Sequence, residues 1–265
     1  TLRQMYYVGV SQNVYTNSER SYKNLGNLVS DARLAGLMDW DAIEDRVRRP
    51  RVPSEFSGVE QLIETASYWY RLPRWEGQEN YVELWVEKDA LAGVLAPIAS
   101  EYHVTMMVNR GYSSQSAMYE AGKRYIANCR DGRYPHLIYL GDMDPSGEDM
   151  VRDISDRLEM YNVGDLNVTK VALTMDQVES YKPPPNPAKM SDSRAAKYVD
   201  KHGTSSWEVD ALPPAALSKI IRDELSSLVD RALMDKIIEQ ENKDKQAIRE
   251  MAWAYAEKQR KTKKG

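Results

Sequence analysis

The alternation of strand and helix patterns between about residues 78 and 180 constrains the fold more than any other feature of the sequence. Short apolar runs that fit strands alternate there with longer segments that fit helices. The strands are expected at 82–86, 104–108, 136–140 and 168–173, and the helices at 89–100, 113–128 and 147–161. Parallel strands need crossover connections of about this length, and such crossovers are almost always right-handed. The pattern therefore predicts an α/β fold with a mainly parallel sheet that is covered by helices on both faces.

The residues before this array have helical patterns, expected at 2–14, 18–37 and 41–49. Ser18 is placed to cap the second of these helices, Gly36 to end it, and Asp39 or Asp41 to cap the third. Short helices joined by tight turns indicate a helix-turn-helix or winged-helix module. We expect residues 52–75, which contain Pro and Gly, to form its wing or a connector.

A Pro-rich segment at 183–187 follows the array, and it excludes regular helix or an interior strand there. Helical patterns return at 191–201, 214–229 and 232–260, and the chain ends in a basic tail. We therefore divide the chain into an N-terminal helical domain (1–76), an α/β domain (77–180) and a helical C-terminal extension (181–265).

The composition excludes several classes of protein. With one cysteine, Cys129, the chain of 265 residues cannot form an internal disulfide, which argues against a secreted disulfide scaffold. No apolar run approaches the roughly 20 residues of a membrane helix, so we expect no membrane association and a cytoplasmic location. The formal net charge of -4 argues against a protein that coats nucleic acid through bulk charge, but it leaves local basic surfaces open. The chain begins at Thr1 rather than Met, so we expect residues upstream to be missing.

Acidic residues follow two of the expected strands. Glu87 comes directly after residue 86, and Asp142 and Asp144 follow the strand that ends at residue 140. Ligands of open parallel sheets bind beyond the carboxyl ends of the strands, so these three carboxylates converge if the two strands are neighbours. Three close carboxylates need a cation to stay ionised together, and hard oxygen ligands suit Mg²⁺, or Mn²⁺ in its place. The alternative is that the two Asp residues lie in an ordinary turn and that Glu87 caps a helix.

The segments around these acids resemble a known family. Trp85-Val86-Glu87-Lys88-Asp89-Ala90 and Leu140-Gly141-Asp142-Met143-Asp144-Pro145-Ser146-Gly147 look like the two acidic motifs of a Toprim domain, and Arg110-Gly111-Tyr112-Ser113-Ser114 resembles the loop after its second strand. The Toprim domain is the Rossmann-like, metal-binding module of topoisomerases, bacterial primases and several nucleases. The resemblance covers roughly residues 80–175, and it implies that Glu87, Asp142 and Asp144 hold Mg²⁺.

The first residues narrow the family. Thr1-Leu2-Arg3-Gln4-Met5-Tyr6-Tyr7 looks like the Arg-x-x-Tyr-Tyr segment of the topoisomerase VI A subunit and its meiotic double-strand-break relatives. The resemblance implies a winged-helix domain before the Toprim domain, and a homodimer in which the Tyr of one subunit meets the metal of the other. It also implies that Tyr7 attacks a DNA phosphate and becomes linked to a 5′ end. The chain is shorter than those proteins, and its overall pattern is closer to uncharacterised Toprim proteins of phages and prophages, which implies a bacterial, archaeal or phage-infected cell.

The chemistry of Tyr7 has its own requirements. A phenol with a pKa of about 10 is a poor nucleophile until a base, a cation or a metal helps it to ionise. Arg3 lies one helical turn before Tyr7 and could supply positive charge to the phosphate or the phenolate. The alternative is that Tyr7 packs in the core with its hydroxyl bonded, because Tyr is abundant here, with 17 residues against a single Phe.

Basic residues near these motifs are candidates to contact DNA. Lys88 and Arg110 each follow a strand beside an expected acidic ligand and could contact phosphate, although surface salt bridges would explain them equally well. A run of arginines beside the expected recognition helix could also contact phosphate, or it could be a solvated helix end paired with Glu44 and Asp45. These arginines are Arg46, Arg48, Arg49 and Arg51.

The function expected from these observations is Mg²⁺-dependent cleavage of DNA phosphodiesters by transesterification, with a separate ATPase as partner for full topoisomerase activity. One alternative is a Toprim nuclease in which metal-activated water attacks and Tyr7 is structural. Another is a non-catalytic DNA-binding accessory protein of phage replication. The segments Asp192-Ser193-Arg194 and Trp207-Glu208-Val209-Asp210-Ala211-Leu212 look specific, but no chemistry can be assigned to them from the sequence.

Overall fold

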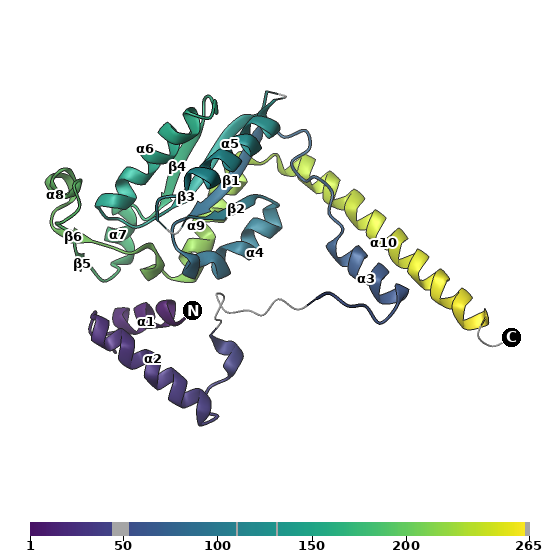
Figure 1. The fold of residues 1–265 in the computed structure, drawn as a ribbon, viewed down its shortest axis with the longest axis horizontal. Helices are drawn as coiled ribbons and strands as arrows, with labels where there is room; N and C mark the ends of the chain where they lie inside the picture. Colours follow the sequence, from purple (N-terminus) through teal and green to yellow (C-terminus); the bar gives the residue numbers. More distant parts are fainter. Residues whose placement is uncertain (44–52, 110, 131, 263–265) are drawn as a thin grey trace. The chain divides into compact units, whose positions relative to one another are not determined.

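The computed structural model describes residues 1–43, 53–109, 111–130 and 132–262. The fold is α/β, with a parallel four-stranded sheet in the order β2-β1-β3-β4 (Figure 1). Its strands are β1 (Asn80–Val86), β2 (Thr105–Val108), β3 (Tyr134–Leu140) and β4 (Asn167–Ala172). The predicted parallel sheet is confirmed, and its order is consistent with a Rossmann-like domain.

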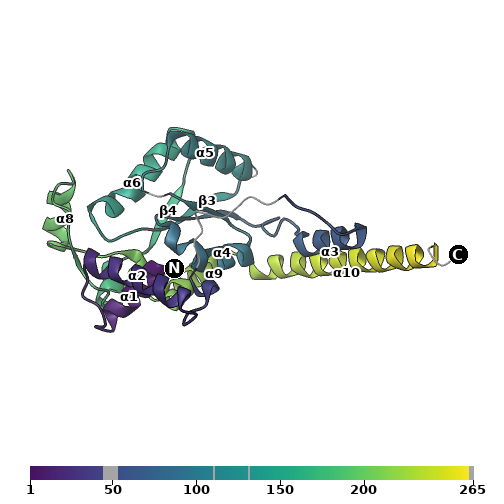
Figure 2. The same cartoon turned by 60° about the horizontal axis from the view of Figure 1, so that its bottom comes forward.

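Helices cover the sheet on both faces, as Figure 2 shows. On one face lie α5 (Gln115–Cys129) and α6 (Pro145–Glu159). On the other face α9 (Pro214–Leu228) packs against β4 and against α4 (Ala92–Tyr102), which follows the short 3₁₀ helix η2 (Asp89–Leu91). Burial on both faces explains why the strands have nearly continuous apolar runs.

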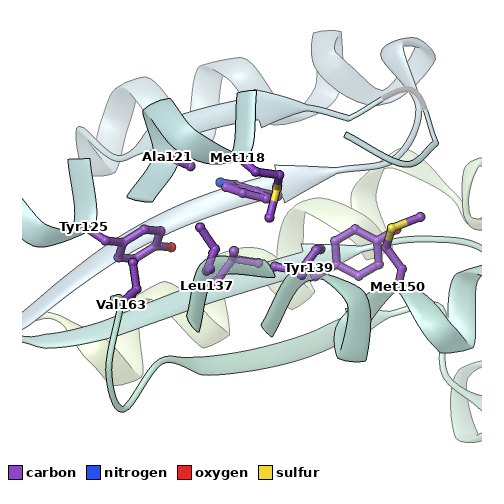
Figure 3. Packing of buried hydrophobic residues seen from close by; sticks show 10 residues of the cluster. Met118, Ala121, Tyr125, Leu137, Tyr139, Met150 and Val163 are labelled. Carbon is purple, nitrogen blue, oxygen red and sulfur yellow. The ribbon is translucent and has the colours of Figure 1, made fainter. Parts of the chain in front are cut away.

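The core between the sheet and α5 and α6 is rich in large side chains (Figure 3). Met118 and Tyr125 from α5 pack with Leu137 and Tyr139 from β3, and Met150 closes the cluster from α6. All five side chains are buried. Burial of apolar surface of this kind is the main favourable term that holds helices onto a sheet.

One carboxylate, Glu83 of β1, is fully buried in this sheet. Arg124 donates to both of its oxygens, each at 2.9 Å, and the hydroxyl of Tyr81 and the indole N–H of Trp85 donate at 2.8 Å. A buried charge is tolerated only when it is paired and hydrogen-bonded in this way. Sequence reasoning did not single out Glu83, because its partners come from positions that no local pattern connects.

The N-terminal residues form two of the three expected helices, α1 (Leu2–Ser11) and α2 (Glu19–Leu34). Ser18 caps α2, Gly36 follows its end with a φ of 72°, and Asp39 caps the short 3₁₀ helix η1 (Trp40–Ala42), as expected. Most of the third helix expected at 41–49 lies outside the described residues.

The segment expected to be a wing or a connector contains a helix instead, α3 (Val59–Trp69). Gly58 occupies the position just before this helix and Pro73 comes after its end. Gly58 and Pro73, which suggested irregular structure, therefore lie on either side of α3 and do not interrupt it.

Five short elements lie between the sheet and α9. They are α7 (Met175–Tyr181), β5 (Asn186–Pro187), α8 (Ala195–His202), β6 (Ser205–Ser206) and the 3₁₀ helix η3 (Val209–Ala211). The Pro-rich segment forms no helix and no interior strand, and its last two residues pair only with β6, antiparallel. An antiparallel bridge between Met143 and Trp207 then joins this region to the loop after β3.

The chain forms two compact units, and each is built from two separate segments. One contains residues 1–46 and 79–228, and the other contains residues 47–78 and 229–265. The second unit is a pair of helices, in which α3 packs on α10 (Arg231–Thr262). The three domains expected from the sequence are consecutive stretches of the chain, whereas each compact unit combines two segments that are far apart in the sequence. In the described part of the chain no helix is both long and apolar enough to cross a membrane.

Candidate functional site

Glu87 and Asp142 lie at the same edge of the sheet because β1 and β3, whose pairing the sequence left open, are parallel neighbours. Val86 pairs with Leu140 in the last register position of the two strands. The backbone N–H of Glu87 donates to the carbonyl oxygen of Leu140 (2.8 Å), and the backbone N–H of Asp142 donates back to Oε2 of Glu87 (3.1 Å). Glu87 therefore makes both contacts between the two strand ends, through its backbone N–H to Leu140 and through its carboxylate to the N–H of Asp142.

The carboxylate of Asp142 is mostly buried, with 9% of the residue exposed. Its Oδ1 accepts the backbone N–H of Val209 (2.8 Å) and lies 2.8 Å from Nζ of Lys88. Burial raises the pKa of Asp142 above its usual range, and the nearby charge of Glu87 adds to this effect while Lys88 opposes it. Lys88 is therefore the neighbouring cation that favours the ionised form of this carboxylate.

Asp144 has a structural role as the N-cap of α6. Its Oδ1 accepts the backbone N–H of Gly147 (2.6 Å) and the hydroxyl of Ser146 (3.0 Å). The turn is so tight that a Cβ added to Gly147 would lie 2.1 Å from the carbonyl oxygen of Asp142. Only glycine fits there, because real Cβ atoms do not approach a backbone oxygen so closely.

The three carboxylates do not form a ready-made metal centre. Among the described residues there is no group of three or more His, Cys, Asp and Glu side chains that could hold a metal ion, so the predicted convergence is not seen. The reason is that each carboxylate already has a partner. Asp142 pairs with Lys88, Asp144 accepts a backbone N–H from the first turn of α6, and Glu87 accepts the backbone N–H of Asp142. However, these interactions use one oxygen of each carboxylate, and the other oxygen of each accepts no hydrogen bond from any described residue. Three hard oxygen donors of this type fit the ligand preference of Mg²⁺.

Lys88 is the centre of a larger ion network. Its ammonium lies 2.8 Å from Asp142, 2.8 Å from Glu208 and 3.0 Å from Asp210. Burial opposes the charge of Lys88, but the three carboxylates outweigh this effect and raise its pKa. The structure therefore gives Lys88 a mostly buried place among carboxylates, rather than a place in a surface salt bridge.

Arg3 joins α1 to the same network. Its Nε lies 2.7 Å from Oδ2 of Asp210, and its Nη2 contacts Glu208. Its guanidinium also lies over the ring of Tyr7, 5.9 Å from the ring centre. The expected neighbourhood of Arg3 and Tyr7 on one helix face is present, although two carboxylates already share the charge of Arg3.

The two tyrosines at the start of the chain have different environments. Tyr6 is used structurally, because its hydroxyl accepts the backbone N–H of Ser18 (2.7 Å) and lies within hydrogen-bond distance of two carbonyl oxygens. Tyr7 is 6% exposed and lies near the carboxylate of Glu208. Burial and the negative charge of Glu208 raise the pKa of Tyr7, and the charge of Arg3 offsets this only in part. Tyr7 is therefore held as a neutral phenol in this state.

A pocket of about 440 Å³ brings the N-terminal helix and the sheet edge together. Arg3, Tyr6 and Tyr7 of α1 line it on one side, and Asp142, Asp144 and Glu208 line it on the other. All these residues belong to the same compact unit. Tyr7, the nucleophile expected from the sequence, thus shares one cavity with Asp142 and Asp144, two of the three expected metal ligands. The third expected ligand, Glu87, does not line this cavity.

Glu208 and Asp210 are the site residues that sequence reasoning missed. They belong to the segment 207–212, which looks specific in the sequence but suggested no chemistry. The bridge between Met143 and Trp207 brings this segment beside the loop after β3. Burial opposes the ionisation of Glu208, but Lys88 and Arg3 outweigh it and lower the pKa of its carboxyl group. The remaining candidates, Arg46, Arg48, Arg49, Arg51 and Arg110, lie outside the described residues.

Comparisons of the chain with protein-family models, with curated proteins and with solved structures found no match.

Proposed function

We propose that this protein is a magnesium-dependent enzyme that cleaves DNA by transesterification, with Tyr7 as the nucleophile. In this reaction the phenolic oxygen of Tyr7 forms a bond to a backbone phosphorus, and the bond from that phosphorus to the 3′ oxygen breaks. The proton of Tyr7 goes to a base, the 3′ oxygen leaves with a proton, and the protein remains joined to the 5′ end.

The observation that carries the proposal is the shared pocket. Tyr7 and Arg3 line the same cavity as Asp142 and Asp144, although about 135 residues separate the two groups in the sequence. A transesterase needs its nucleophile beside the groups that stabilise charge on the phosphate. Ion pairs of Arg3 with Glu208 and Asp210 hold α1 at this cavity.

Each residue has a role in the proposal. Glu87, Asp142 and Asp144 would hold Mg²⁺, which when bound would stabilise the negative charge that develops on the phosphate. Arg3 would supply positive charge beside the ring of Tyr7. Glu208 lies near the hydroxyl of Tyr7 and would receive its proton.

A search for a covalent protein–DNA adduct tests the proposal. The full chain is incubated with end-labelled DNA in Mg²⁺ or Mn²⁺, and the mixture is denatured with detergent before separation. We expect label to remain on the wild-type protein and on Tyr22→Phe, which removes another hydroxyl from the same pocket. We expect no label on Tyr7→Phe. An adduct that survives Tyr7→Phe would overturn the assignment of the nucleophile.

The second candidate is a nuclease that uses metal-activated water and the same carboxylates. The raised pKa of Tyr7 favours it, because a buried phenol beside Glu208 resists ionisation. Under this alternative, cleavage without an adduct persists in Tyr7→Phe and is lost in Asp142→Ala. Under a third, non-catalytic alternative, Glu87→Gln changes no DNA assay and calorimetry detects no binding of Mg²⁺ or Mn²⁺.

The proposal extends to partners. By analogy with the family that the sequence resembles, we propose a homodimer that acts on DNA with a separate ATPase. Light scattering on the full chain gives the mass in solution and tests the dimer directly.

A further inference from the structure

A second pocket, of about 280 Å³, lies between α6 and α8 and is richer in positive charge than the first. Arg152, Arg194, Lys197 and Lys201 line it, together with the carboxylates of Glu148 and Asp149. The proposed reaction uses none of these six side chains. Three of the four cations come from the start, middle and end of α8, at positions that share one helix face.

The two arginines of this pocket are held in fixed positions. Arg152 donates to both oxygens of Asp149, at 2.8 and 2.9 Å, and Arg194 contacts the same carboxylate at 3.2 Å. Arg194 is also held by Asp192, at 2.7 Å, so the motif Asp192-Ser193-Arg194 has a structural explanation. Carboxylates therefore compensate the charge of both arginines and orient their guanidinium groups.

The two lysines carry the uncompensated charge. Lys197 is exposed and forms no ion pair with any described residue. Lys201 lies 3.9 Å from Glu148, whose carboxylate is already bound by Lys170 at 2.9 Å. The pocket therefore presents two exposed ammonium groups beside two oriented guanidinium groups, and this combination suits an anion with several oxygen atoms.

The pocket is also next to the proposed cleavage site. Asp144 lines the first pocket, and the next residue, Pro145, lines the second. The hydroxyl of Tyr198 donates to the carbonyl oxygen of Met143 (2.8 Å), which fixes α8 to this same loop. Because a nucleic-acid strand carries one charge for about every 3.4 Å of helix axis, a strand in the first pocket has further phosphates within reach of the second.

We propose that the pocket between α6 and α8 binds a phosphate of the DNA backbone next to the phosphate that is cleaved. This inference takes its ligand from the proposed function, but it concerns binding and needs no cleavage. Contacts with phosphate fix the register of a strand without reading its sequence. The pocket therefore positions the DNA relative to Tyr7 and the carboxylates.

The test is a binding measurement without divalent metal, so that cleavage plays no part. Fluorescence anisotropy of a labelled duplex is recorded with the full chain over a series of salt concentrations. The double variant Lys197→Ala/Lys201→Ala is compared with Lys123→Ala/Lys219→Ala, which removes two other exposed helix lysines. We expect the first variant to bind about tenfold more weakly, and the slope of log K against log[salt] to become less negative by about 1 to 2. We expect the control to match the wild type.

The outcomes separate this inference from the proposed function. If both double variants bind DNA like the wild type, the pocket does not hold DNA phosphate and the inference fails, whatever the adduct assay shows. If the pocket variant binds weakly while no adduct forms with any protein, the inference stands and the proposed transesterase fails. Inorganic phosphate is titrated by calorimetry as a further arm. Phosphate binding that depends on Lys197 and Lys201, with unchanged DNA affinity, would assign the pocket to a small phosphate compound and overturn the inference.

Discussion

At the scale of single residues, the electrostatics of the site are set by two cations that pair with a larger number of carboxylates. Lys88 and Arg3 are shared among Asp142, Glu208 and Asp210, while Glu87 and Asp144 follow the neighbouring ends of β1 and β3. Lys88 therefore does in this structure what a divalent ion would do at the sheet edge, because it keeps neighbouring carboxylates ionised. An ion that entered would compete with Lys88 for Asp142.

Replacing Lys88 tests this competition. Lys88→Met keeps most of the length of the side chain but leaves three carboxylates, two of them buried, without their common partner. We expect unfolding by urea to show a loss of about 3 kcal/mol in stability, which is typical when one partner of a buried ion pair is removed. We also expect millimolar Mg²⁺ to stabilise Lys88→Met more than the wild type, because Asp142 is then available.

Lys123→Met is the matched control for this change. Lys123 forms an exposed pair with Glu120 one helical turn away, so its loss should change stability by less than about 0.5 kcal/mol and leave the effect of Mg²⁺ as in the wild type. Equal stabilisation of Lys88→Met and the wild type by Mg²⁺ would refute the view that Lys88 and a metal compete.

At the scale of elements, the sequence predicted the parts of the fold that local patterns determine. The four strands were found because both faces of the sheet are buried, which leaves continuous apolar runs in the sequence. The helix α3 was missed because Gly58 and Pro73 suggested a loop, although both lie outside the helix. The carboxylates Glu208 and Asp210 could not be placed, since only the bridge at Trp207 brings them to the site.

Asp144 caps α6 and is a proposed metal ligand, and two substitutions separate the observed role from the proposed one. Asp144→Asn keeps an oxygen that can cap the helix, so stability should change by only a few tenths of a kcal/mol, while the charge that a metal needs is lost. Asp144→Ala removes the cap and should cost about 1 kcal/mol. Denaturant unfolding and the adduct assay are run side by side, and we expect both variants to lose the adduct.

Thr174→Ala provides the control for capping, because Thr174 caps α7 in the same way and lies outside the pocket. It should also cost about 1 kcal/mol but keep the adduct. If Asp144→Asn forms the adduct at the rate of the wild type, the carboxylate acts as a helix cap and takes no part in catalysis.

At the scale of the whole molecule, the chain leaves one compact unit near residue 46, returns to it at residue 79 and leaves it again at residue 228. The second unit has two helices and few buried apolar side chains, so its stability depends strongly on polar interactions. Its main buried charge is Glu241 of α10. This carboxylate accepts the backbone N–H of Leu72 (3.1 Å) and pairs with Arg74 (3.1 Å) and Lys245 (2.6 Å).

These contacts make the helix pair sensitive to acid. Burial opposes the ionisation of Glu241, but Arg74, Lys245 and the N–H of Leu72 outweigh it and lower its pKa to about 2. Because the unfolded chain binds this proton at a pH near 4.3, the stabilisation is complete above that pH and is lost as the pH falls towards 2. Hydrogen exchange, corrected for intrinsic rates, should show α3 and α10 losing protection between about pH 4.5 and 3. In Glu241→Gln, the amides of α3 and α10 should exchange faster at neutral pH and should not lose further protection in acid. The control is Glu239→Gln, which removes an exposed ion pair with Lys243 and should behave like the wild type. An unchanged acid response in Glu241→Gln would show that another group controls the stability of the helix pair.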